Sequence, residues 1–171
     1  RAMPLVGHSQ IRARGTLGGS LAHADPAAEL PAVAVALDAR LTLASARGRR
    51  TVAAEDFFVA ALTTSLAPDE ILTGVSFPPW PARAGASVQE VAIRRGDFAI
   101  GEVAATLTLD ESGRVGAARI VCFGVGPRPA RAGRRAGRFS GGAVRGLRSA
   151  ADPGLRLGLR PRSARGEEQP R

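Results

Sequence analysis

The 171-residue sequence has no lysine, a single cysteine and no long run of apolar residues. One cysteine, Cys122, excludes an internal disulfide framework and a cysteine-based metal cluster. A membrane-spanning helix needs about 20 consecutive, mostly apolar residues, and no stretch of this sequence approaches that length. The sequence also starts without the charged and then apolar pattern of a signal peptide, so the expected localisation is cytoplasmic.

Because lysine is absent, all 24 basic residues are arginines, as expected of a very GC-rich coding sequence. These arginines are unevenly distributed. Residues 1–126 carry 12 arginines and 12 acids, whereas residues 127–171 carry 12 arginines and 3 acids, which accounts for the net charge of +9. The basic character therefore describes the last quarter of the chain and says nothing about its body.

The most distinctive stretch runs over residues 15–29, with the sequence GTLGGSLAHADPAAE. Its three glycines predict a loop whose backbone takes positive φ and approaches another group closely. Thr16 and Ser20 add hydroxyls that can donate to an anion, and Asp25 followed by Pro26 predicts the N-cap and first turn of a helix. A glycine-rich loop before a helix suits a phosphate group. A plain structural turn is the alternative that this pattern leaves open.

Two helices are predicted in the body of the chain. An alanine-rich, apolar segment over 26–37 predicts a buried helix. An interior proline would cost about 3 kcal/mol, so the regular helix is expected to begin near Glu29, which places Pro31 in its first turn. A second, short helix is expected over 57–62, after the acidic start provided by Glu55 and Asp56.

Alternation of apolar and polar residues predicts strands, and with the helices an α+β fold. The first two strands form a hairpin and the last three an antiparallel meander. Cys122, in an apolar run of the last strand, is expected to be a small buried residue rather than a reactive thiol. A proline-rich segment over 78–85 marks a domain boundary. The predicted strands are 39–45, 50–54, 70–77, 87–93, 100–109 and 115–125.

Several of these segments, taken in order, resemble a known family. The segments are GHSQIRARGTLGGSLAHADPAAELP, ARLTLAS, EDFF, PDEILTGVSFP and IRRGDFAI. Together they resemble the FAD-binding medium subunit of molybdenum hydroxylases, the enzymes of the aerobic carbon monoxide dehydrogenase and xanthine dehydrogenase type. The resemblance covers about residues 4–130. It implies the second lobe of a two-lobed, PCMH-type α+β domain that binds FAD, followed by a small domain with a three-stranded antiparallel sheet.

The resemblance implies three parts of the chain. Residues 1–82 match the second lobe of the FAD-binding domain, 83–129 match the start of the C-terminal domain, and 130–171 form a tail rich in arginine, glycine and proline. The first lobe, with its own phosphate loop, is expected to precede residue 1. The tail departs from the family pattern and is expected to be out of frame, with a disordered natural tail or a nucleic-acid arm as alternatives.

The resemblance also implies the cofactor contacts. The segment 16–20 matches the loop that holds the FAD pyrophosphate, and an acidic part of the same motif follows it. An apolar contact and a polar contact lie further along the chain, the polar one at Glu90 or its neighbour Gln89. The implied contacts are Thr16, Leu17, Gly18, Gly19, Ser20, Asp25, Glu29, Leu72 and Glu90.

No catalytic residue and no metal ligand belongs to this set, because the redox chemistry is that of FAD. Electrons are expected to come from a large subunit with a molybdenum cofactor, through a small subunit with 2Fe–2S clusters. The flavin is expected to pass them to NAD or a quinone-type acceptor. The chain alone is expected to bind FAD weakly or not at all, since the first lobe contributes half of the binding site.

Three other functions stay open as alternatives. The basic tail suits nucleic acid, although it has one aromatic residue, Phe139, and no RNA-recognition motif. A hydrolase built on Ser20, His23 and Asp25 is disfavoured, because neighbours on one short loop rarely reach triad geometry. A metal site built on His8, His23 and Asp25 lacks the further close ligand that zinc sites have.

Overall fold

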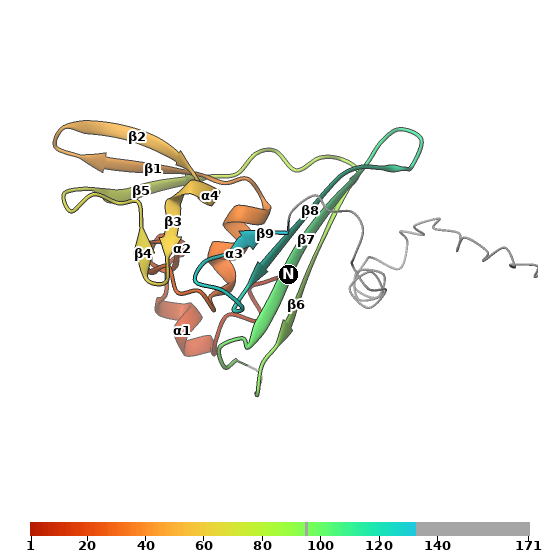
Figure 1. Cartoon of the computed structure of the whole chain (residues 1–171), viewed down its shortest axis with the longest axis horizontal. Helices are drawn as coiled ribbons and strands as arrows, with labels where there is room; N and C mark the ends of the chain where they lie inside the picture. Colours follow the sequence, from red (N-terminus) through yellow and green to blue (C-terminus); the bar gives the residue numbers. More distant parts are fainter. Residues whose placement is uncertain (95, 133–171) are drawn as a thin grey trace, which may run out of the picture.

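The computed structural model describes residues 1–94 and 96–132, so most of the predicted tail lies outside the described residues (Figure 1). Four helices occur in the described part of the chain: α1 (Ser9–Arg14), α2 (Leu17–His23), α3 (Glu29–Ala36) and α4 (Ala54–Phe57). None of them is long and apolar enough to cross a membrane. The strands pair antiparallel in three separate sheets, which confirms the predicted α+β class.

The first sheet has the order β2-β1-β5, and a small hairpin, β3 with β4, lies beside it. The third sheet has the order β6-β7-β8-β9, and its first three strands make a long ribbon (Figure 1). Helix α3 lies between the first sheet and this ribbon (Figure 1). The strands are β1 (Arg40–Ser45), β2 (Gly48–Ala53), β3 (Phe58–Ala60), β4 (Thr63–Thr64), β5 (Ile71–Ser76), β6 (Ala84–Val91), β7 (Gly101–Leu109), β8 (Val115–Phe123) and β9 (Ala130–Arg131).

The alternation of apolar residues located the main strands correctly. The predicted hairpin is β1 with β2, the strand after it is β5, and the meander is β6, β7 and β8. The predicted start of the buried helix is also confirmed, because α3 begins at Glu29 with Pro31 in its first turn. At that position the missing proline N–H costs nothing, since the first amides of a helix have no intrahelical partner.

The predicted helix over 57–62 is wrong. Helix α4 ends at Phe57, and the chain continues as the β3–β4 hairpin, with Leu62 at a φ of 53° in the turn. Phe57 and Phe58 are both fully buried and pack edge to face, with ring centroids 5.2 Å apart. The core therefore takes two consecutive large side chains, while Val59 and Leu62 are exposed. Tertiary packing overrides the local helix signal here.

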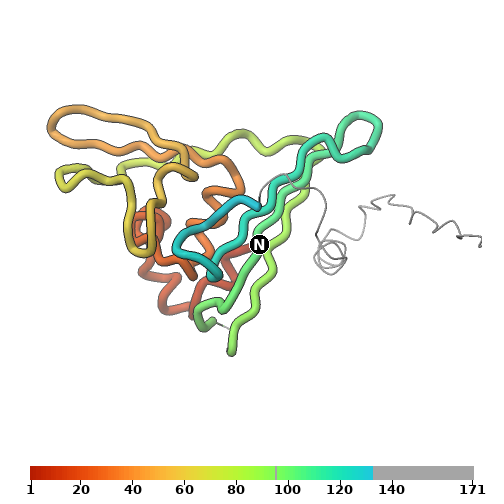
Figure 2. The backbone as a smooth tube through the Cα atoms, in the orientation of Figure 1, coloured from red at the N-terminus to blue at the C-terminus, as the bar shows by residue number. Residues whose placement is uncertain are grey.

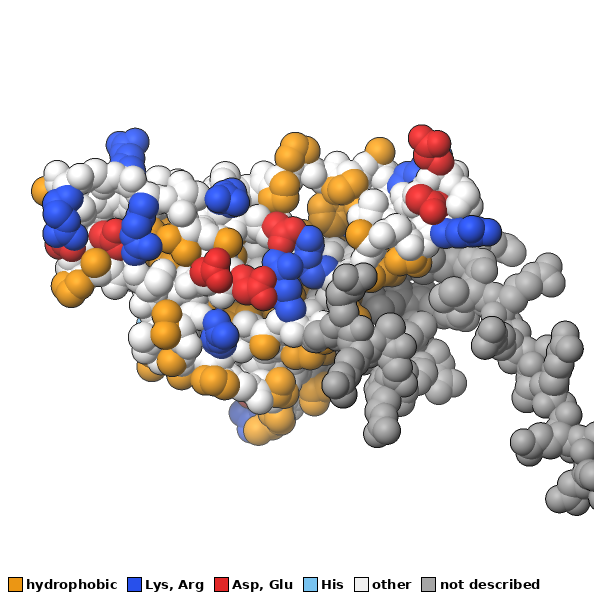
Figure 3. Space-filling model, turned by 45° about the horizontal axis from the view of Figure 1, so that its top comes forward, with side chains coloured by type: hydrophobic (Ala, Val, Ile, Leu, Met, Phe, Trp, Pro, Cys, Tyr) orange, Lys and Arg blue, Asp and Glu red, His pale blue; other side chains and the backbone are white. Residues whose placement is uncertain are grey.

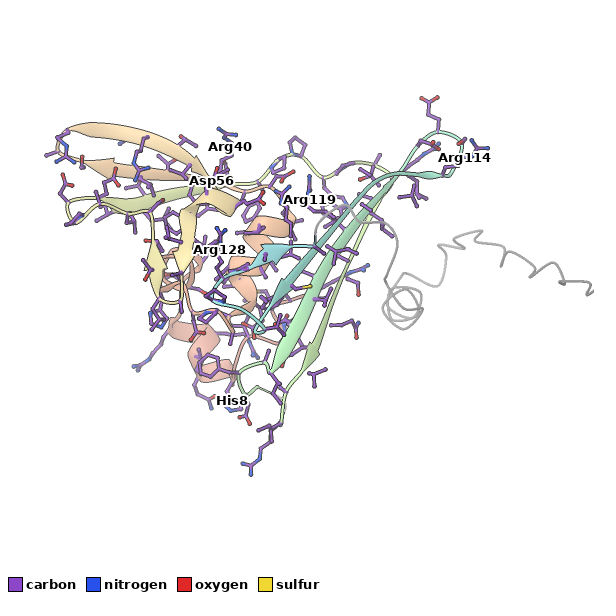
Figure 4. All side chains as sticks on the ribbon, viewed as in Figure 1. His8, Arg40, Asp56, Arg114, Arg119 and Arg128 are labelled. Atoms are coloured by element: carbon purple, nitrogen blue, oxygen red, sulfur yellow. The ribbon has the colours of Figure 1, made fainter. Side chains whose placement is uncertain are left out.

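The implied three-stranded sheet has a fourth strand, β9, within the segment that the sequence assigned to the tail. Arg131 of β9 pairs with Asp38, at the end of α3, and its Nε lies 2.9 Å from Glu55 Oε2. Arg119 of β8 pairs with the same Asp38, and Figure 4 shows Arg119 beside α3. A strand of two residues has no periodicity that the sequence could reveal. Its backbone pairs antiparallel with Val121 and Cys122 of β8, and these ion pairs attach it to the rest of the fold.

A single hydrophobic core joins the first sheet to the ribbon. Its largest fully buried side chains come from α2, α3, α4, β1, β3 and β8: Leu21, Pro31, Val35, Leu41, Leu43, Phe57, Phe58, Val121 and Phe123. Figure 2 shows residues 77–83 crossing from β5 to β6, and no helix or strand forms there. The division into two domains at this segment stays a prediction.

Charges of both signs are interspersed on the face shown in Figure 3. This agrees with the equal numbers of arginines and acids in residues 1–126.

Candidate functional site

The glycine-rich stretch is largely helical, which corrects the predicted loop. Helix α2 begins at Leu17, and Thr16 is its N-cap, with Oγ1 accepting a hydrogen bond from Gly19 N at 2.9 Å. A threonine followed by an amide three residues on is the geometry of a helix N-cap. Gly15, Gly18 and Gly19 all lack positive φ. The glycines are therefore not needed for a left-handed turn.

The glycines provide space instead. A Cβ at Gly19 would lie 2.9 Å from Thr16 Oγ1, closer than real Cβ atoms come, so the Thr16 hydroxyl would have to shift from its observed position. A Cβ at Gly18 would lie 4.0 Å from Leu72 Cδ2, which places Leu72 of β5 beside the start of α2. The structure therefore brings the predicted phosphate segment and the predicted apolar contact together.

Asp25 does not cap the next helix, so this part of the prediction is wrong. Its Oδ1 accepts a hydrogen bond from Ala27 N at 2.8 Å, which makes a local turn. Helix α3 begins at Glu29, four residues after Asp25, and has no side-chain cap. The helix start is set by burial of its apolar residues rather than by an aspartate cap.

The start of α2 is an exposed group of amides suited to an anion. Thr16, Leu17 and Gly19 are exposed. In the part of the chain that the structure describes, the amides of Leu17 and Gly18 donate to no hydrogen bond. Unpaired amides at the beginning of a helix attract phosphate oxygens, and Thr16 holds this turn in place. The residues present therefore fit a phosphate-bearing cofactor.

A second group of functional side chains lies between α3 and the ribbon. Glu29 is the first residue of α3, while Glu90 of β6 and Glu102 of β7 are register partners. One carboxylate oxygen of each lies within 4.8 Å of the others, and we call these residues the acidic cluster. Glu29 is 8% exposed and Glu102 is 3% exposed. Carboxylates that lie this close together and are shielded from water need a counter-charge, hydrogen bonds or protons to offset the cost of burying their negative charge.

The surroundings change the acidity of two members of the acidic cluster. The pKa of Glu102 is raised to about 9, mainly by burial and also by the negative charges of Glu29 and Glu90. Burial also raises the pKa of Glu29, and a hydrogen bond with its own backbone partly offsets this. The nearby charges of Glu90 and Asp25 act in the same direction as burial. Asp25 therefore lies close enough to Glu29 to influence it.

The predicted site residues thus fall into two groups. Residues 16–20 lie with Leu72, whereas Glu29 and Glu90 lie in the acidic cluster. Contact of these residues with FAD stays a prediction. Sequence reasoning missed Glu102. The available signal was its place on the buried face of a predicted strand, two residues from the buried Ala104.

The alternative sites do not assemble. Among the described residues, no hydrogen bond joins Ser20, His23 and Asp25, and His8 does not form a metal-ligand group with His23 and Asp25. Cys122 lies on β8 as predicted, but it is half-buried, because its neighbours on the strand face the core. The nucleic-acid alternative rests on a tail of which all but residues 130–132 lies outside the described residues.

Comparison with known proteins identifies similar chains. Residues 1–80 match the family model described as the FAD binding domain in molybdopterin dehydrogenase. The chain is 46% identical over 121 residues to the 6-hydroxypseudooxynicotine dehydrogenase complex subunit alpha of Paenarthrobacter nicotinovorans. It is 47% identical over 119 residues to the nicotine 6-hydroxylase medium subunit of the same organism. These matches cover 71% and 70% of this chain and 41% of each relative.

A solved structure of the same family is also similar to this chain. Carbon monoxide dehydrogenase from Hydrogenophaga pseudoflava superimposes with a TM-score of 0.73 at 33% sequence identity. The match covers 76% of this chain and 45% of that chain. The chain therefore spans about two fifths of the length of the curated relatives it matches.

Proposed function

We propose that the chain forms part of an electron-transfer flavoprotein. Over the part that these comparisons cover, it belongs to the FAD-binding medium subunits of molybdenum hydroxylases, which are the carbon monoxide and xanthine dehydrogenase family. Its relatives are named as subunits or medium chains of larger dehydrogenases. The proposed partners are a molybdenum-cofactor large subunit and a 2Fe–2S small subunit. The proposed electron acceptor is NAD or a quinone-type molecule.

The observation that supports this function best is the start of α2. The unpaired amides of Leu17 and Gly18 and the hydroxyl of Ser20 are the groups that we assign to the FAD pyrophosphate. Thr16 positions them, because its side chain accepts from Gly19 N and holds the first turn. Two negative phosphates at this position gain from the partial positive charge of a helix N-terminus.

The remaining predicted contacts have supporting roles. Leu72, beside Gly18, offers an apolar surface to the cofactor. Asp25, Glu29 and Glu90 supply carboxylates on the side of α3. When bound, FAD supplies the redox chemistry. The chain's own part is to bind and orient the cofactor.

A titration of the chain with FAD tests the assignment. We expect weak, saturable quenching of flavin fluorescence, reversed by ADP, which carries the same pyrophosphate. Gly19→Ala should weaken binding, because the new Cβ forces Thr16 Oγ1 out of its observed position at the start of α2. Gly85→Ala is the matched control, since a Cβ at Gly85 meets nothing within 4 Å.

Two outcomes count against the proposal. Equal FAD affinity in the chain and in Gly19→Ala would show that the start of α2 does not bind the cofactor. Quenching that ADP fails to reverse would place any bound flavin elsewhere on the protein.

A further inference from the structure

Three glutamates from distant parts of the chain converge between α3 and the ribbon. Glu29 begins α3, and Glu90 and Glu102 lie directly opposite each other on β6 and β7. Like charges in such a cross-strand position normally repel and destabilise the sheet. One carboxylate oxygen of each residue nevertheless lies within 4.8 Å of the other two.

The carboxylate of Glu102 is buried and has no partner. The residue is 3% exposed, and neither of its two oxygens has a hydrogen-bond partner in the part of the chain that the structure describes. The same holds for Glu90 Oε2. An unsatisfied buried acceptor is rare in proteins and carries a substantial cost. These oxygens point to a ligand that supplies positive charge.

Arginine side chains do not fill this role in the observed ion pairs. Within residues 1–94 and 96–132, the ion pairs connect Arg47, Arg50, Arg119 and Arg131 with Asp69, Glu70, Asp38 and Glu55. None of these pairs reaches the acidic cluster.

The geometry points to a divalent-cation site, with Ca²⁺ as the best-fitting ion, held by Glu29, Glu90 and Glu102. Two oxygens bound to one Ca²⁺ at about 2.3–2.6 Å lie at most about 5 Å apart, and the three carboxylates meet this limit. A shared proton bridges only two carboxylates at a time. One cation satisfies all three together.

The ligand set selects the class of ion. Three glutamates offer up to six oxygens in mono- or bidentate binding, which suits the flexible coordination of Ca²⁺. Mg²⁺ demands a near-ideal octahedron and keeps several waters, which a buried cluster accommodates poorly. Structural zinc sites use mainly cysteine and histidine, and the cluster has neither. The cation would tie the first turn of α3 to β6 and β7.

Glu29 and Glu90 also belong to the proposed FAD contacts, but cation binding is measured without FAD, so each proposal can fail independently of the other. The full chain is first stripped with EDTA and then titrated with Ca²⁺ by calorimetry. Mn²⁺ serves as a second probe, since the EPR signal of the free ion disappears when it binds. We expect one site per chain and a rise in the thermal midpoint when Ca²⁺ is added.

Two variants locate the site. Glu102→Gln keeps the shape of the side chain and should weaken Ca²⁺ and Mn²⁺ binding at least tenfold and abolish the rise in thermal midpoint. Glu111→Gln changes an exposed acid in the turn between β7 and β8 and should leave both unchanged. If Glu102→Gln does not fold by circular dichroism, Glu90→Gln at a half-buried position makes the same comparison.

Either of two results would overturn the inference. One is the lack of saturable binding up to about 10 mM Ca²⁺ or Mn²⁺, above the range of even weak calcium modules. The other is equal affinity in the unmodified chain and in a folded cluster variant, which would show that the ion binds elsewhere.

Discussion

Phe123→Ala should destabilise the first sheet and the ribbon together, because Phe123 belongs to the core that they share. Its side chain is fully buried on β8, in one cluster with Leu41 and Leu43 of β1. Removal of a buried phenylalanine side chain typically costs about 3–5 kcal/mol, from lost burial and from the cavity left behind. Total stabilities of domains are about 5–15 kcal/mol, so this single change removes a large share.

Urea unfolding followed by circular dichroism measures this effect. A urea slope of about 1–3 kcal/mol per molar converts the expected loss into a midpoint shift of at least about 1 M. Val115→Ala is the control, since Val115 lies on the same strand but is 46% exposed, and it should change stability by less than about 0.5 kcal/mol. A loss below about 1 kcal/mol for Phe123→Ala would refute the shared core. Separate transitions for the two sheets in the unmodified chain would refute it as well.

Three further predictions concern single positions. Thr16→Val removes the side-chain cap of α2 and should lower the free energy of unfolding by about 1 kcal/mol in the same urea assay, whereas Thr16→Ser should keep the stability of the unmodified chain. Equal stabilities of the two variants would contradict the cap. Hydrogen bonds from Arg50 and Ala67 lower the pKa of Glu70 to about 2, so the ionised Glu70 stabilises the fold fully above the ordinary carboxylate pKa. This stabilisation is lost as pH falls from about 4.5 to 2. Glu70→Gln should flatten this part of the acid-unfolding curve, and an unchanged curve would argue against the Arg50–Glu70 ion pair. Gly124→Ala should cost about 1–3 kcal/mol, because Gly124 has a φ of 74° and a Cβ there would lie 3.2 Å from Ala99 O; stability matching that of Gly85→Ala would contradict this.

Local patterns predicted the elements whose residues alternate strictly or obey a proline rule. The strands β1 and β5 to β8 follow from alternation, since one face of each is more buried than the other, whereas the largely exposed β2 was predicted as the second strand of a hairpin. The start of α3 follows from the position of Pro31, which is compatible with the first turn of a helix but not with its interior.

The sequence misled where tertiary contacts decide the local structure. Glycines in residues 15–19 suggested a loop, yet capping by Thr16 and contact with β5 make the segment helical from Leu17. Burial of both Phe57 and Phe58 replaced the expected helix with the β3–β4 hairpin.

The acidic cluster was beyond sequence reasoning for a different reason. Glu90 and Glu102 become neighbours only through the register of β6 against β7, and Glu29 joins them only because α3 packs on that sheet. No spacing along the chain encodes such a meeting. The family resemblance, by contrast, followed from the order of several motifs, and the comparisons confirm it.

The most direct test of the proposed function is the flavin content of a chimera. In this chimera, residues 1–131 replace the matching part of the Hydrogenophaga pseudoflava medium chain. The replaced part makes up 45% of that medium chain. Flavin absorbance per protein after gel filtration is compared between this chimera and its Thr16→Val and Thr16→Ser variants, with folding verified by circular dichroism. Near-stoichiometric FAD in the chimera and in Thr16→Ser, with clear loss in Thr16→Val, is the predicted result. A folded chimera without FAD, or equal FAD in all three proteins, would contradict a pyrophosphate site at the start of α2.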